Sequence, residues 1–297
     1  MVVCAPTPAI RFLRESLRRW GRMKKTVLIT GASSGIGLAA AKVFAGNDWN
    51  VIATMRQPAA GSELARLPGV SVTRLDVQDR ESIDAAVAGG VERFGRIDAL
   101  INNAGFSLFG VFEAVSREKI QEQFDVNVFG VMDVTRALLP HFRGNKGGLI
   151  INISSRAGLV GLPMISLYCA AKYALEGFSE ALAYELASQN IVIKVVEPSG
   201  GVTGTSFSQR MAQEKTAGAT TADYAEFMTR TNAIFATMQA ARKTTAGDVA
   251  RVIYEAATDG SGQFRYFIGE DVGDFVQAKR EKSDQDYIHF MRARFSP

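Results

Sequence analysis

Short apolar runs alternate with helix-like segments along most of this chain. Continuous apolar runs of this length are typical of parallel strands that are buried on both faces of a sheet. Alternation of such strands with helices favours a doubly wound α/β sheet with helices on both faces. We therefore predict one α/β domain with a parallel sheet of about seven strands. The predicted strands are residues 26–30, 50–55, 70–75, 97–101, 148–154, 191–197 and 264–268.

The segments between these runs have the apolar spacing and the residue types of helices. A helix-like stretch rich in Met and Ala, residues 206–242, interrupts the alternation before the last strand. We expect residues 25–297 to form the domain and about 204–245 to form a lid over a substrate site. The other predicted helices are residues 36–46, 79–94, 116–142, 167–189, 246–257 and 271–292.

Positive charge is concentrated at the beginning of the chain. Residues 1–25 contain seven basic side chains and one acid, while the whole chain has a net charge of +4, so the rest is slightly acidic. We interpret residues 1–24 as a basic extension that is disordered, and we expect no nucleic-acid binding by the domain. Alternatively, Ile10–Trp20 could form a basic amphipathic helix that contacts a membrane or directs targeting, and Met23 could be the natural start.

The two cysteines, Cys4 and Cys169, have neither a disulfide spacing nor a zinc-site spacing. We therefore expect a reduced, cytoplasmic setting and no bound metal. No window reaches about 18 uninterrupted apolar residues, so we expect no membrane-spanning helix.

A glycine-rich turn follows the first strand and reads Gly31-Ala-Ser-Ser-Gly35-Ile-Gly37. Glycines allow the backbone to approach a pyrophosphate, and the helix that follows offers its N–H groups and positive dipole end. The strand–turn–helix order predicts a dinucleotide site, although such glycines can also serve only the conformation of the turn.

The end of the second strand indicates which dinucleotide is bound. A fold that prefers NAD usually has an acid about twenty residues after the glycine turn, bonded to the ribose 2′-OH. Residues 51–61 contain no Asp or Glu, and Arg56 follows the strand. A guanidinium there can bind a 2′-phosphate, so we predict NADP(H) with Ser33 as a second contact. The alternative is that Arg56 only stacks on the adenine.

Tyr168 and Lys172 are the main candidates for proton transfer. They are four residues apart on a predicted helix, which places them on one face about 5–6 Å apart at Cβ. An ammonium beside a phenol is expected to lower the tyrosine pKa toward neutrality, where Tyr168 could act as acid or base. The Ser155 hydroxyl, just after a strand, could hold a substrate oxygen. A Tyr-x-x-x-Lys pair alone is more often an ordinary surface pair.

Four motifs occur in order along residues 26–270: TGASSGIG, NNAG, Ser155 with Tyr168-x-x-x-Lys172, and a loop beginning at Pro198. Together they resemble the classical short-chain dehydrogenase/reductase family, which implies a Rossmann-type fold and an oxidoreductase. Residues 153–182, ISSRAGLVGLPMISLYCAAKYALEGFSEAL, look like the hydroxysteroid and retinol dehydrogenase branch of that family.

The resemblance implies a role for individual residues. Asn127 would hold a proton-relay water, Tyr168 would be the acid/base, and Lys172 would bind the ribose and lower the tyrosine pKa. Ser155 would polarise the substrate oxygen; its neighbour Ser154 is the alternative, but the thirteen-residue spacing from Tyr168 favours Ser155. With the contacts argued above, the expected cofactor-binding residues are Gly31, Ser33, Ser34, Gly35, Ile36, Gly37, Arg56, Asp76, Val77, Asn103, Ala104, Gly105, Tyr168, Lys172, Pro198, Val202 and Thr205.

The loop after the sixth strand departs from the family pattern. The family usually has Pro-Gly-x-Val-x-Thr, whereas this chain has Pro198-Ser-Gly-Gly-Val202-Thr203-Gly-Thr205. Either Thr203 or Thr205 could therefore meet the nicotinamide carboxamide.

We expect a hydrophobic ketone, aldehyde or secondary alcohol as substrate, because the residues expected at the pocket, Phe106, Val160 and Leu162, are apolar. The alternatives are a non-catalytic NADP(H)-binding regulator or scaffold, and an isomerase or epimerase on the same fold. The resemblance also implies a homodimer or homotetramer.

Overall fold

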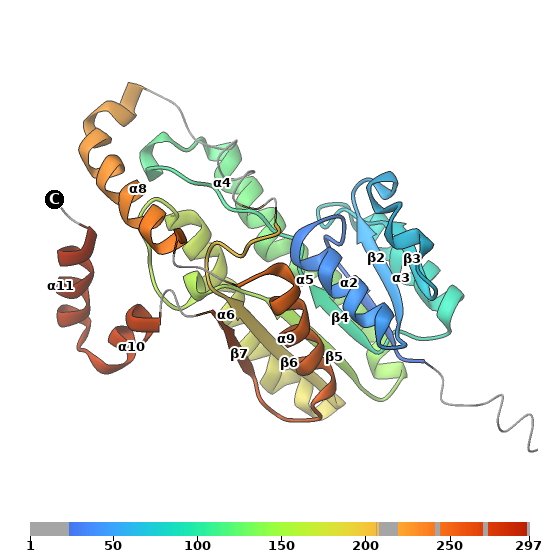
Figure 1. Ribbon diagram of the computed structural model, residues 1–297. Helices are drawn as coiled ribbons and strands as arrows, with labels where there is room; N and C mark the ends of the chain where they lie inside the picture. Colours follow the sequence, from blue (N-terminus) through green and yellow to red (C-terminus); the bar gives the residue numbers. More distant parts are fainter. Residues whose placement is uncertain (1–23, 206, 208–218, 241–243, 270–272, 296–297) are drawn as a thin grey trace, which may run out of the picture.

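The computed structural model describes residues 24–205, 207, 219–240, 244–269 and 273–295. Its centre is a seven-stranded parallel sheet with the strand order β3-β2-β1-β4-β5-β6-β7 (Figure 1). The predicted doubly wound α/β fold is confirmed. The strands are β1 (Thr26–Ile29), β2 (Asn50–Met55), β3 (Val70–Arg74), β4 (Ala99–Asn102), β5 (Gly148–Ile153), β6 (Ile191–Pro198) and β7 (Arg265–Ile268).

Helices cover both faces of the sheet because successive strand residues point to opposite faces. Val27 and Ile29 of β1 pack in one core with helices α2 and α9, whereas Leu28 packs in the other core with α3, α5 and α6. These helices are α2 (Gly35–Gly46), α9 (Ala246–Thr258), α3 (Arg80–Phe94), α5 (Gly130–Gly144) and α6 (Ser166–Leu186). The apolar runs are thus buried on both sides, as their composition predicted.

The predicted helix at residues 116–142 contains an irregular turn. It consists of α4 (Arg117–Phe124), a π-helical turn η4 (Asp125–Phe129) and then α5. Single π turns are frequent at functional sites. This one contains Asn127, which is buried.

The predicted C-terminal helix at residues 271–292 is wrong as a single element, because two helices occupy the region. They are α10 (Gly273–Glu281) and α11 (Asp284–Phe295). The Ser283 hydroxyl accepts a hydrogen bond from the Asp286 N–H at 3.2 Å, so Ser283 acts as an N-terminal cap for α11.

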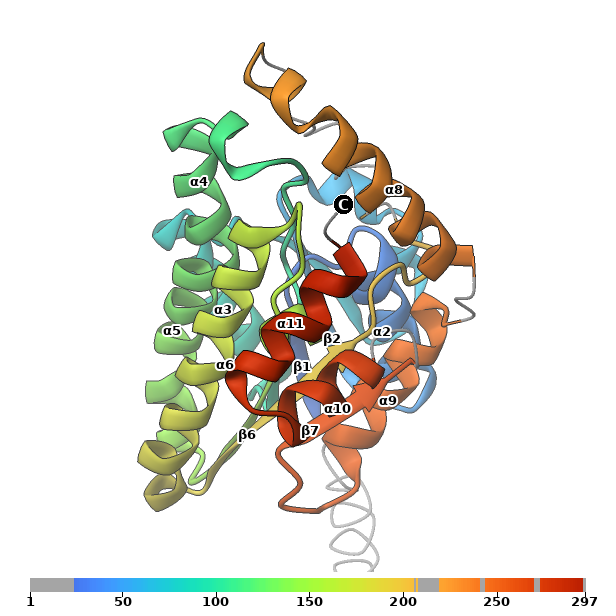
Figure 2. The same ribbon diagram turned by 90° about the vertical axis from the view of Figure 1, so that its left-hand side faces the viewer.

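The C-terminal helices pack with helix α8 (Ala225–Ala240) at the β7 end of the molecule (Figures 1 and 2). Phe235 of α8 and Phe275 of α10 both contact Phe295 of α11, with ring centroids 6.0 and 5.9 Å apart. Fully buried Val160, from the loop after β5, joins the same cluster. These helices therefore form a wall beside the segment that precedes α6.

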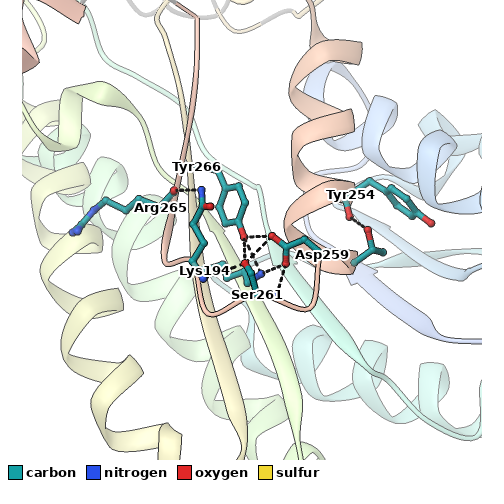
Figure 3. A network of polar contacts seen from close by, with 8 residues as sticks. Lys194, Tyr254, Asp259, Ser261, Arg265 and Tyr266 are labelled. Atoms are coloured by element: carbon teal, nitrogen blue, oxygen red, sulfur yellow. Dashed lines mark hydrogen bonds and ion pairs between the residues drawn. The ribbon is translucent and has the colours of Figure 1, made fainter.

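A partly buried polar network links the edge strand β7 to β6 (Figure 3). Lys194 of β6 donates hydrogen bonds to Asp259 at 2.6 Å and to the Tyr266 hydroxyl at 2.9 Å. Tyr266 in turn donates to the other carboxyl oxygen of Asp259 at 2.5 Å. Arg265, next to Tyr266, points away from this network (Figure 3), because adjacent strand residues face opposite sides.

The expected extension at residues 1–24 lies, except for Lys24, outside the described residues, and so does part of the expected lid. Within the described chain, no helix combines the length and the apolar character needed to cross a membrane.

Candidate active site

Tyr168 and Lys172 lie one turn apart in the first half of α6, and both side chains are buried. The Lys172 amine lies 5.6 Å from the centroid of the Tyr168 ring. It donates a hydrogen bond to the Ile153 carbonyl, the last residue of β5, at 2.8 Å. The structure therefore brings the tyrosine and lysine together and ties them to the carboxyl end of the central strand β5.

Ser155 also lies at that strand end, two residues after Ile153. Its hydroxyl accepts the Ala157 N–H at 3.2 Å and is hydrogen-bonded to Tyr168. A serine and a tyrosine hydroxyl in contact can together bind one substrate oxygen, because each can donate a hydrogen bond.

The expected lowering of the Tyr168 pKa is wrong for this arrangement. Burial raises the pKa of Tyr168 well above its ordinary value, and the hydrogen bond with Ser155 opposes only part of that rise. The Phe207 ring contributes to this burial, since it packs edge-on against the Tyr168 ring with centroids 5.8 Å apart. Burial also lowers the pKa of Lys172 to about 8. The spacing predicted proximity but could not predict how strongly both groups are desolvated.

Asn127 lies in the π turn η4, and its side chain holds the loop after β4. Its amide oxygen accepts the Phe106 N–H at 3.1 Å, and its amide nitrogen donates to the Phe106 carbonyl at 2.7 Å. Gly105 is required beside it, because a Cβ there would lie 2.9 Å from the Asn127 amide oxygen. Asn127 thus fixes the backbone of Phe106, one of the residues expected at the substrate pocket.

The glycine turn has the shape of a dinucleotide cradle. Gly31 and Gly35 have positive φ angles of 68° and 57°, which favour glycine. A Cβ at Gly37 would lie 2.4 Å from the Gly31 carbonyl oxygen, so the turn leaves no room for a side chain there. The Asn103 amide donates to the carbonyls of Thr30 and Gly31 at 2.9 and 3.1 Å. These contacts fit the backbone approach that a pyrophosphate needs at a helix N-terminus.

Ala104 of the NNAG motif supports the glycine turn through close packing and a hydrogen bond. Ala104 packs so closely on Gly31 that a Cβ at Gly31 would lie 2.9 Å from the Ala104 Cα. The Ala104 N–H donates to the Thr30 hydroxyl at 3.0 Å. The motif therefore supports the turn.

The loop after β6 separates the two candidate threonines. Thr203 pairs with the Thr244–Thr245 segment, donating its N–H to the Thr244 carbonyl at 3.0 Å. The side chain of Thr205 lies against Gly35, where an added Cβ would be 3.2 Å from it. The structure thus places Thr205 at the glycine turn and Thr203 at the base of α9, while Pro198 ends β6 and Val202 packs on the adjacent core.

Arg56 is exposed immediately after β2, near the glycine turn. The turn is joined to this strand because the Ala32 N–H donates to the Thr54 carbonyl at 2.9 Å. The first acid after β2, Glu63, is paired with Lys42 of α2 at 2.5 Å. The segment after β2 therefore begins with the cation Arg56, and residues 51–61 contain no carboxylate.

At the next strand end, the Asp76 carboxylate accepts the Gln78 N–H at 3.2 Å, so its loop is held in a tight turn. Val77 is buried against Gly130 of α5, where a Cβ would lie 2.8 Å from the valine.

The apolar residues expected to contact substrate lie in different surroundings. Val160 is fully buried among the C-terminal helices. Leu162 contacts both that cluster and the cluster that contains Tyr168 and Phe207. Leu162 is therefore closer to the candidate acid/base than Val160 is.

The sequence patterns did not indicate the buried Glu176, which lies close to Lys172. Glu176, one turn after Lys172 on α6, pairs with Arg265 of β7, and Arg265 also pairs with buried Glu197. The four-residue spacing from Lys172 was a usable signal for Glu176, whereas Arg265 comes from a distant part of the sequence.

The chain has clear relatives among known proteins. A family model described as short chain dehydrogenase matches residues 25–216. An uncharacterized oxidoreductase of Schizosaccharomyces pombe is 37% identical over 236 residues, which cover 79% of this chain and 96% of that protein. Retinol dehydrogenase 8 of Homo sapiens is 40% identical over 190 residues, or 60% of each chain.

Among solved structures, a short chain dehydrogenase/reductase from Burkholderia phymatum in complex with NAD is similar to the chain with a TM-score of 0.74. The two are 25% identical, and the match covers 92% of this chain and 97% of the other. These similarities agree with the glycine turn and the cluster of Ser155, Tyr168 and Lys172 at the carboxyl end of the sheet.

Proposed function

The chain belongs to the short chain dehydrogenase family of NAD(P)-dependent oxidoreductases that act on CH–OH and C=O groups, and we propose that Tyr168 is its acid/base, that NADP(H) is its preferred cofactor, and that its substrate is apolar. The observation that carries this proposal is the contact of Ser155 with Tyr168, beside Lys172, at the carboxyl end of β5. Open α/β sheets bind their ligands at this edge.

The nicotinamide cofactor supplies the hydride chemistry when it is bound. In the proposal, Gly31, Gly35 and Gly37 admit its pyrophosphate at the N-terminus of α2, and Thr205 rather than Thr203 contacts it. Support for this choice is the position of Thr205 against Gly35.

Proton transfer is assigned to Tyr168. Its raised pKa keeps the phenol protonated at neutral pH, which is the form that donates to a carbonyl oxygen. Ser155 holds the same oxygen through its hydroxyl. Asn127 fixes the Phe106 loop beside the site and, as the family pattern implies, holds a water for proton relay.

The preference for NADP(H) is supported by the exposed guanidinium of Arg56 and by the absence of an acid in residues 51–61. An Arg can bind a 2′-phosphate through two parallel hydrogen bonds, whereas a carboxylate at this place would repel it. Ser33 of the glycine turn is the proposed second contact.

An apolar substrate is supported by the side chains near Tyr168. Leu162 and Phe207 contact the Tyr168 cluster, and Ile165 joins it to a second apolar cluster that contains Phe109. In that second cluster Phe109 packs on Phe235 of α8, with ring centroids 6.1 Å apart. The similarity to retinol dehydrogenase 8 is consistent with a hydrophobic alcohol or carbonyl compound.

We also propose that the protein forms a homodimer or homotetramer through its long helices. Large side chains are exposed on this surface, including Phe129 of η4 and Tyr184 of α6, at 50% and 73% exposure. The cytoplasmic location expected from the cysteine content stays a prediction.

The first experiment is a fluorescence titration of the purified protein with NADPH and with NADH, followed by an assay of NADPH consumption with hydrophobic ketones and aldehydes. Tight NADPH binding, weak NADH binding and steady consumption support the proposal. Tight NADH binding overturns the cofactor choice. Cofactor binding without turnover of any carbonyl compound favours a regulator or scaffold instead.

A further inference from the structure

Three buried side chains follow one another at four-residue intervals along α6. Tyr168, Lys172 and Glu176 are 9%, 6% and 5% exposed. Residues four apart lie one above the other on the same face of a helix. Lys172 is therefore placed between the candidate acid/base and a buried carboxyl group.

Glu176 is held from the neighbouring edge strand. Its Oε2 lies 3.2 Å from Nε of Arg265 of β7. The same guanidinium lies 3.1 Å from Glu180 of α6 and 3.4 Å from Glu197 of β6. Arg265 points away from the Lys194 network, toward this side of the sheet (Figure 3). Because one guanidinium contacts three carboxyl groups, the position of the Glu176 carboxyl group is well defined.

The cluster is continuous in sequence with the active site. Glu176 lies one turn after Lys172, Glu197 immediately precedes Pro198 of the cofactor loop, and Arg156 immediately follows Ser155. Arg156 is buried and interacts electrostatically with Glu197. A change in this cluster is therefore positioned to affect the candidate catalytic groups.

Neighbouring charges act differently on the two buried carboxyl groups. Burial, followed by repulsion from Glu176, raises the pKa of Glu197 to about 8. Glu197 is therefore largely protonated at neutral pH. Burial raises the pKa of Glu176 as well, while Arg265 and Lys172 favour its charged form.

We propose that Glu176 is a positioning residue for Lys172: its buried carboxylate, fixed by Arg265, keeps the Lys172 amine charged and aligned beside Tyr168. A buried ammonium is unstable unless an opposite charge lies near it. The interaction with Glu176 opposes the effect of burial on Lys172. The Ile153 carbonyl accepts one hydrogen bond from the amine but adds no full charge.

The charged environment must be considered as a whole, because each group affects the others. Besides Glu176 and Glu197 themselves, the charged groups of this set are Lys172 and Glu180 of α6, Arg156 of the 3₁₀ turn η5 (Arg156–Gly158), Arg265 of β7 and Arg280 of α10. Glu176 is the member of this set on the same helix face as Lys172, one turn away, so the Lys172 charge depends most strongly on it.

The effect of Glu176 on Lys172 can be measured without enzymatic turnover. Only the expected consequence for catalysis rests on the proposed function. We would label lysine side chains with ¹³C at the ε position and follow the Lys172 signal by NMR as a function of pH in the cofactor-free protein. The signal is identified by its absence in Lys172→Met. In Glu176→Gln, we expect the midpoint of the Lys172 titration to fall by about one pH unit.

Glu180→Gln is the matched control, because Glu180 pairs with the same Arg265 but is half exposed. We expect the Lys172 titration to be unchanged in this variant. In Glu176→Gln, the alkaline limb of the kcat/KM profile should shift to lower pH together with the NMR midpoint, whereas a purely structural role would reduce activity equally at all pH values. An unchanged Lys172 midpoint in Glu176→Gln overturns the proposal, even if Tyr168 proves essential for turnover.

Glu176→Asp provides a second test if the glutamine variant does not fold. The shorter side chain keeps the charge but draws it away from Lys172, so we expect a smaller fall of the same midpoint and partial rescue of the pH profile. A wild-type midpoint in Glu176→Asp together with a pH-independent loss of activity would contradict the assignment.

Discussion

The Lys172 amine lies above the Tyr168 ring, 5.6 Å from its centroid, and gives its hydrogen bond to the Ile153 carbonyl. The lysine is therefore anchored to strand β5 independently of the tyrosine hydroxyl. Removing that hydroxyl should leave the lysine and the cofactor pocket in place, which allows the proton-transfer step to be tested separately from cofactor binding.

Tyr168→Phe should reduce kcat by about 10²–10⁴-fold, the usual contribution of a positioned acid or base. The NADPH affinity measured by fluorescence should stay close to that of the wild type. Tyr184→Phe is a control on the same helix, since that tyrosine is 73% exposed. Equal activity of the Tyr168 and Tyr184 variants would refute the assigned role of Tyr168.

Arg56→Asp should reverse the cofactor preference. It removes the proposed 2′-phosphate contact and introduces a carboxylate that can bind a ribose 2′-OH instead. Loss of one charge-assisted hydrogen bond corresponds to about a tenfold or greater loss of NADPH affinity. The measurement is the ratio of NADPH to NADH dissociation constants.

The control for this change is Arg66→Asp, because Arg66 is exposed in the nearby turn Leu64–Arg66 but outside the proposed pocket. If Arg56→Asp and Arg66→Asp alter the affinity ratio equally, the effect is one of overall charge and the specific contact is disproved.

The strands were predictable from sequence because parallel strands buried on both faces are apolar throughout, as in Asn50–Met55, whose bounds agree with the prediction. Tyr168 and Lys172 were brought together as their spacing predicted. Their burial was not predictable, since it depends on Phe207 and on strand β5, which are remote in sequence.

Two further features could not be derived from periodicity. The π turn at Asp125–Phe129 interrupts an otherwise regular helical pattern, and its Asn127 makes a tertiary hydrogen bond to Phe106, 21 positions earlier. The pair of Glu176 with Arg265 joins residues 89 positions apart. A charged residue within a strand or helix gives no information on so distant a partner.

Gly37→Ala should destabilise the protein and weaken binding of either cofactor. The added methyl group would lie 2.4 Å from the Gly31 carbonyl oxygen of the turn itself and 2.5 Å from the amide nitrogen of Asn103, which hydrogen-bonds to the turn. Overpacking of this kind typically costs about 1–3 kcal/mol in the free energy of unfolding. Urea denaturation and NADPH titration measure the two effects.

Gly46→Ala provides the matched comparison for that substitution. Gly46 ends the same helix α2, and an added Cβ there meets no atom within 4 Å. Alanine favours the helix over glycine, so stability should be unchanged or increased by up to about 1 kcal/mol. If both variants lose cofactor affinity to the same extent, close packing of the turn is not the cause.

Glu197→Gln should change how the stability of the protein depends on pH. Burial raises the pKa of Glu197 from 4.5 in the unfolded chain to about 8 in the folded protein. Between these values the folded protein holds a proton that the unfolded chain has lost, so the contribution of Glu197 to stability is complete below pH 4.5 and is lost as the pH rises toward 8.

The glutamine variant has no titrating group at position 197, so it lacks this pH-dependent contribution to stability. The free energy of unfolding of Glu197→Gln relative to wild type, from urea denaturation at pH 5, 6.5 and 8, should therefore increase with pH, by at most about 1.4 kcal/mol per pH unit. A difference that stays constant across these pH values would show that folded Glu197 holds no proton that the unfolded chain has lost, which would contradict the raised pKa.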